Sequence, residues 1–163
     1  MIAMLVASVL LIQPAQPPVP RLRPTSDVAR DLVVEAMSRS PTIKRLVRDL
    51  EASDLFVYVE LKYDIAEAPA ETAFLVANNA GRFLRVAVDA RFEPRRRIEL
   101  LGHELRHALE IAQAPAVRDA LGMRQLFNDI GWTLHRSLAF ETGAAVDAER
   151  QVSRELARGR SET

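Results

Sequence analysis

The sequence predicts a single α+β domain, in which a small antiparallel sheet of about three strands packs against N-terminal and C-terminal helices. Apolar residues recur at helical spacing in 27–50 and again in 94–158. Between these ranges, residues 54–89 are rich in β-branched and aromatic side chains that roughly alternate with polar ones, as in strands. A chain of 163 residues with 48% hydrophobic and 27% charged residues has the composition of one globular domain.

The N-terminal residues differ from the rest of the chain. Residues 2–12 carry no charge and have the length of a signal-peptide core rather than of a membrane span. We therefore predict that residues 1–15 are a signal peptide and that the protein is exported to the periplasm or the outside; otherwise they are an N-terminal hydrophobic segment of a cytoplasmic protein. Five of the nine prolines lie in 14–24 and predict a linker over 16–26.

The domain is expected to span residues 27–158, followed by a disordered tail over 159–163. Its first helix is predicted at Asp27–Arg39, after the capping side chains of Thr25 and Ser26. A second helix begins at Ser40-Pro41, because serine suits the cap and proline the first helical position.

Three strands follow, at 54–62, 72–77 and 82–89. Asn78-Asn79-Ala80-Gly81 predicts a hairpin turn between the last two, since Asn and Gly tolerate positive φ. In the third strand Leu84, Val86 and Val88 share the face that should pack against the helices.

The second half of the chain is predicted to be helical. One helix opens at Glu93-Pro94 and runs to about Gln113, and a second covers 115–127. The form of 131–139 is open, and the last helix is expected over 140–158.

Composition excludes several functions. The chain has no cysteine, which rules out disulfides, thiolate ligands and cysteine catalysis. A net charge of zero argues against a nucleic-acid partner or an anionic membrane surface, and we expect no stable membrane span once the leader is removed. We interpret the basic run Arg95-Arg96-Arg97 as the solvated start of a helix rather than as an anion contact.

The sequence His103-Glu104-Leu105-Arg106-His107 is an H-E-x-x-H motif. On a helix its two imidazoles share one face and can hold Zn²⁺, while the glutamate can act as base on a metal-bound water. The opposite face of this helix is apolar. The alternative is a solvated polar face that happens to hold two histidines, since such a helix would also have one polar and one apolar face.

Glu141 is the candidate for the third ligand that a two-histidine zinc site needs. On a helix over 140–158 it falls in line with the apolar stripe, where an unpaired carboxylate is costly. Asp147 falls on the polar side and is a poor candidate. The alternative for Glu141 is a partly exposed carboxylate that the helix dipole stabilises.

The motif His103–His107, followed 34 residues later by Glu141-Thr142-Gly143-Ala144, resembles the gluzincin-type zincin metallopeptidases, and the order of elements is similar to the compact minigluzincins. The resemblance implies His103, His107 and Glu141 as zinc ligands and Glu104 as general base and acid. Glu110 is an alternative third ligand, or more readily a partner that orients an imidazole.

This resemblance implies a zinc metallopeptidase that hydrolyses peptide bonds of a peptide or protein substrate. His135 is the candidate donor to the oxyanion, with Tyr58 and Tyr63 as weaker candidates. An extended substrate could pair with a sheet edge at 72–77.

The alternative functions are a non-catalytic zincin-like module for metal binding or interaction, and a plain α+β binding domain. A di-iron site is disfavoured, because it needs a second E-x-x-H and the chain has none.

Overall fold

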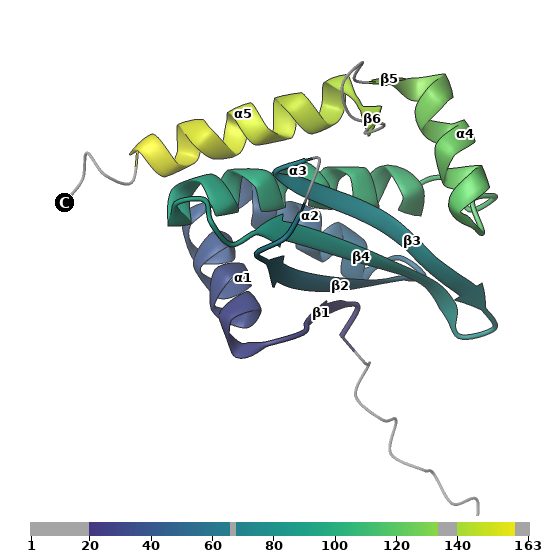
Figure 1. The fold of residues 1–163 in the computed structure, drawn as a ribbon, viewed down its shortest axis with the longest axis horizontal. Helices are drawn as coiled ribbons and strands as arrows, with labels where there is room; N and C mark the ends of the chain where they lie inside the picture. Colours follow the sequence, from purple (N-terminus) through teal and green to yellow (C-terminus); the bar gives the residue numbers. More distant parts are fainter. Residues whose placement is uncertain (1–19, 66–67, 134–139, 159–163) are drawn as a thin grey trace, which may run out of the picture.

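The computed structural model describes residues 20–65, 68–133 and 140–158 (Figure 1). Within these ranges it confirms an α+β fold of five helices, a four-stranded sheet and a two-stranded sheet. The expected signal peptide, His135 and the expected tail lie outside the described residues.

The main sheet differs from the prediction in its topology. Its order is β1 (Leu22–Pro24), β2 (Leu55–Lys62), β4 (Gly81–Asp89) and β3 (Ala70–Asn78). The hairpin β3–β4 is antiparallel as predicted, but β2 pairs with β4, the second strand of that hairpin, and is therefore parallel to it. The sheet is thus mixed rather than antiparallel, and β3 is left at its edge.

Strand β1 lies inside the range predicted as linker, so the fold begins before residue 27. It runs parallel to β2, and Leu22 is buried in the core. The carboxylate of Glu51 accepts hydrogen bonds from the backbone N–H groups of Arg21 (2.9 Å) and Leu22 (3.0 Å). The proline in this strand is tolerated because edge strands do not need every backbone donor.

The helices are α1 (Asp27–Arg39), α2 (Pro41–Glu51), α3 (Pro94–Ala112), α4 (Ala120–Ile130) and α5 (Gly143–Arg158). Helix α4 begins five residues later than predicted, because Asp119 caps it by accepting from the N–H of Gly122 (2.7 Å). The last helix begins at Gly143, so Phe140–Glu141 form a short strand, β6, paired with β5 (Trp132–Thr133). None of the described helices is long and apolar enough to cross a membrane.

Helices α1, α2 and α3 lie against the sheet, and α5 runs along α3 on the side away from it (Figure 1). The core face of β4 carries Leu84, Val86 and Val88, as predicted, but also the fully buried Arg82. The guanidinium of Arg82 pairs with Asp54 (2.7 Å) and donates to the carbonyls of Ile111, Ala112, Ala114 and Val117. Arg82 therefore supplies hydrogen-bond donors to carbonyl groups at the C-terminal end of α3, which have no partner within the helix.

Glu155 fastens α5 to the start of α2. Its carboxylate accepts hydrogen bonds from the hydroxyls of Ser40 (2.5 Å) and Thr42 (2.7 Å) and from the N–H of Thr42 (3.2 Å). Burial raises the pKa of Glu155, but these donors outweigh it, and the pKa lies below its ordinary value of 4.5.

We expect Glu155→Gln to lower the free energy of unfolding at pH 7 by about 1 to 2 kcal/mol, because the hydrogen bonds lose their charged acceptor. A carboxylate whose pKa is lower in the folded than in the unfolded protein stabilises the fold. This stabilisation is complete at pH values above the pKa of the unfolded state and is lost as the pH falls through the pKa of the folded state. The difference from wild type should therefore shrink below about pH 4.5. Urea unfolding across pH 3–7 measures it, with Glu35→Gln, on the exposed side of α1, as control. If the difference in free energy of unfolding between wild type and Glu155→Gln stayed constant with pH, the negative charge of Glu155 would not be what stabilises the contact.

Candidate metal centre

Helix α3 presents His103 and His107 side by side, with their ring centroids 4.8 Å apart. Both are buried. The Nε2 atoms of His103 and His107 lie 3.3 Å and 4.0 Å from Oε1 of Glu141. One ligand atom from each of the three residues lies within 4.8 Å of the others, so the group can hold a metal ion.

Glu141 reaches this group from β6 and not from the last helix, so the predicted helical placement of Glu141 was wrong. Its strand is held by pairing with Trp132 across the β5–β6 ribbon. Gly131 directly precedes β5, and a Cβ atom there would lie only 2.1 Å from the carbonyl oxygen of Glu141. A side chain at position 131 is therefore incompatible with the observed position of Glu141.

The last helix packs directly on the motif helix. A Cβ atom at Gly102 would lie 2.8 Å from Cγ2 of Val152, closer than packed carbons approach. The absence of a side chain next to His103 thus lets α5 come close enough for Glu149 to contact the imidazole of His103.

Each histidine has a carboxylate behind it. Nδ1 of His107 lies 2.9 Å from Oε2 of Glu110, one turn further along α3. Nδ1 of His103 lies 3.0 Å from Oε2 of Glu149 on α5, at hydrogen-bonding distance although off the ideal line of a hydrogen bond. A carboxylate on Nδ1 fixes the ring and directs Nε2 forward, which is the usual arrangement behind a metal-ligating imidazole.

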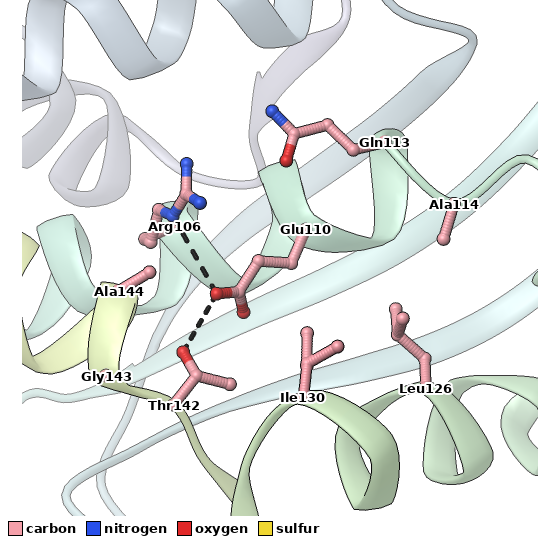
Figure 2. Close-up of a pocket in the computed structure, with 9 residues that line it drawn as sticks. All are labelled: Arg106, Glu110, Gln113, Ala114, Leu126, Ile130, Thr142, Gly143 and Ala144. Atoms are coloured by element: carbon pink, nitrogen blue, oxygen red, sulfur yellow. Dashed lines mark hydrogen bonds and ion pairs between the residues drawn. The ribbon is translucent and has the colours of Figure 1, made fainter.

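Glu110 forms part of the wall of an open cavity of about 360 Å³ between α3, α4 and the start of α5 (Figure 2). Its Oε1 accepts from the hydroxyl of Thr142 (2.8 Å) and lies 3.8 Å from Nε of Arg106. The same hydroxyl accepts from the N–H of Ala145 and so caps α5. Glu110 therefore holds His107 in position, and Glu141 is the carboxylate that faces both Nε2 atoms.

Glu104 points from α3 towards the edge strand. Its Oε2 accepts a hydrogen bond from the hydroxyl of Thr72 on β3 (2.7 Å). Burial raises the pKa of Glu104, and the neighbouring histidines only partly oppose this. A carboxyl group with a raised pKa is a stronger base than an ordinary carboxylate and can both take and return a proton.

The donor atoms fit a metal cation. Nε2 of His107 is buried without a hydrogen-bond partner. Burial lowers the pKa of His103, but the carboxylates of Glu141 and Glu149 outweigh it and raise the pKa to about 10. The carboxylates of Glu104, Glu110, Glu141 and Glu149 lie around the two imidazoles; two of them, Glu104 and Glu110, are buried, and buried carboxylates need cationic partners.

The remaining predicted residues lie elsewhere. The hydroxyl of Tyr58 accepts from Arg23 (3.2 Å), Tyr63 is 75% exposed, and Asp147 is exposed beside Arg150. None of these three belongs to the metal group found among the described residues. The predicted strand 72–77 does lie at the edge of the sheet, within β3.

Glu149, Thr72 and Thr142 were not predicted. A signal for Glu149 exists, because it follows Ala145 by four residues and precedes Val152 by three, which places it on the buried side of α5. No comparable signal marks Thr72, whose contact with Glu104 depends on how the sheet packs on α3.

A scan against models of known protein families, a search of curated proteins and a search of solved structures each found no match to this chain. The zincin family is therefore a proposal that depends on the site itself.

We expect Gly131→Ala to lower the free energy of unfolding by about 1 to 3 kcal/mol, because the new methyl group overlaps the backbone of Glu141 and forces the β5–β6 ribbon apart. Gly143→Ala is the matched control, since a Cβ atom there meets nothing within 4 Å. Urea unfolding of both variants measures the difference. Equal stability would contradict the close approach at residue 131.

Proposed function

We propose that this chain is a zinc-dependent metallopeptidase of the gluzincin type. The observation that carries the proposal is the convergence of His103 Nε2, His107 Nε2 and a Glu141 oxygen, with a carboxylate behind each imidazole. Incidental histidines on a solvated face would be exposed and would lack this paired backing.

Two imidazoles and one carboxylate are a ligand set of catalytic zinc sites, in which the fourth position is kept for water or substrate. A bound zinc ion would lower the pKa of a coordinated water to about 7 and polarise a substrate carbonyl. Thiolate-preferring metals are disfavoured, because the chain has no cysteine.

Glu104 is the residue that moves protons in this proposal. It belongs to the same turn of α3 as the two histidines but faces β3, so it is available as a base beside the metal rather than as a ligand. Thr72 holds its Oε2 oxygen, which leaves Oε1 to take a proton from water and return it to the leaving amine.

Strand β3 is the proposed binding edge for an extended peptide. It is the last strand of its sheet, and its Thr72 touches the proposed base. A peptide paired along this edge would run past Glu104. The alternative function is a non-catalytic metal-binding module, which needs the metal but not the base.

Purified wild-type protein should contain one zinc ion per chain, and Glu141→Gln should lose most of it, because the ligand that faces both Nε2 atoms becomes neutral. Glu110→Gln should retain zinc but bind it roughly 10 to 100 times more weakly, as expected for a residue that only orients a ligand. Metal analysis and competition with a chromophoric chelator measure both. Loss of zinc in Glu110→Gln together with full retention in Glu141→Gln would reverse the two roles.

Glu104→Gln should retain zinc and reduce peptide hydrolysis by roughly 10²- to 10⁴-fold, the usual contribution of a general base. Cleavage of a quenched fluorescent peptide library measures activity, and Asp147→Asn, on the exposed face of α5, is the control. A zinc-loaded wild-type protein without hydrolysis would favour the non-catalytic module.

A further inference from the structure

The basic run at the start of α3 is not simply solvated. Nη1 of Arg96 lies 2.5 Å from Oε1 of Glu149 on α5 and 3.2 Å from Oε2 of Glu99 one turn further along its own helix. The other oxygen of Glu149 is the one that contacts Nδ1 of His103. Glu149 is therefore held at both ends, by a cation on one side and by an imidazole on the other.

We propose that Arg96 and Glu149 are positioning residues of the metal centre, through which the guanidinium sets the orientation of His103 and the affinity for the metal. This rests on the proposed function, because it assumes that His103 binds a metal through Nε2. Arg96 precedes His103 by seven residues, two turns of α3, so one helix supplies both the cation and the imidazole, and α5 supplies the carboxylate between them.

The two histidines are backed in different ways. Glu110, behind His107, is held by the neutral hydroxyl of Thr142, and its nearest cation, Arg106, is 3.8 Å away. Glu149, behind His103, is ion-paired with Arg96. A close cation fixes the direction of a carboxylate, so Arg96 sets where Glu149 meets His103, whereas Glu110 is placed by its hydrogen bond from Thr142.

Arg95 offers a control for a merely structural role. It bonds Glu99 (3.0 Å) and both the carbonyl (3.0 Å) and the hydroxyl (3.1 Å) of Ser153 on α5. It thus links α3 to α5 at the same place as Arg96 does but has no contact with Glu149. Loss of either arginine should weaken the contact between α3 and α5, but only loss of Arg96 should lower the affinity for the metal.

The test uses the full chain with Arg96→Met, Arg95→Met, Glu149→Gln and the double variant Arg96→Met/Glu149→Gln. Zn²⁺ affinity is measured by competition with a chromophoric chelator. Glu149→Gln should weaken binding roughly 10- to 100-fold and Arg96→Met roughly 10-fold, as for other partners that orient a ligand. The double variant should resemble Glu149→Gln alone, because Arg96 acts through that carboxylate.

Arg95→Met should leave the affinity within about threefold of wild type, below the range expected for a partner that orients a ligand. Equal weakening by Arg95→Met and Arg96→Met, or additive effects in the double variant, would overturn the proposal in favour of a structural role.

A second measurement separates this proposal from the proposed function. In chelator-treated protein, ¹⁵N NMR of histidine side chains should show an exchange-protected Nδ1–H of His103, lost in Glu149→Gln and exchanging faster in Arg96→Met than in Arg95→Met. Absence of that protected proton in wild type overturns the positioning role whatever the zinc result. A protected proton in a wild-type protein that does not bind zinc overturns the proposed function instead.

Discussion

The close contact between α3 and α5 is the constraint on which the rest of the centre depends. Gly102 removes the side chain that would separate the helices, and Val152 fills the space. At that separation Glu149 reaches His103, and the residues that precede α5 bring Glu141 to both imidazoles. Wider packing would leave the two histidines with Glu110 of their own helix but without Glu141 and Glu149.

The parts of the centre that the sequence predicted are local in the chain. His103, Glu104 and His107 follow from spacing within one helix, and Glu110 from the next turn. Glu141 was placed correctly beside the histidines for a wrong reason, because it lies on β6 and not in the helical stripe. Periodicity cannot detect a two-residue strand, whose position is set by pairing with β5.

The parts that were missed depend on contacts between distant segments. Strand β1 pairs with β2 across more than thirty residues, and Pro24 hides it from strand propensity. Buried Arg82 lies on the core face of β4, where a charge needs partners. Apart from Asp54, these partners are carbonyls at the end of α3. Backbone acceptors leave no trace in a sequence, so such a side chain cannot be read in advance.

The place of Glu141 on the β5–β6 ribbon has a consequence for how the protein is made. The two histidines leave the ribosome first, and Glu141, the third member of the group, follows 34 residues after His107. Until the ribbon pairs and α5 docks, the nascent chain has the two histidines but not the carboxylates of Glu141 and Glu149 that face them. The group of His103, His107 and Glu141 is therefore complete only once the C-terminal part has folded, and a chain truncated before residue 141 would lack it.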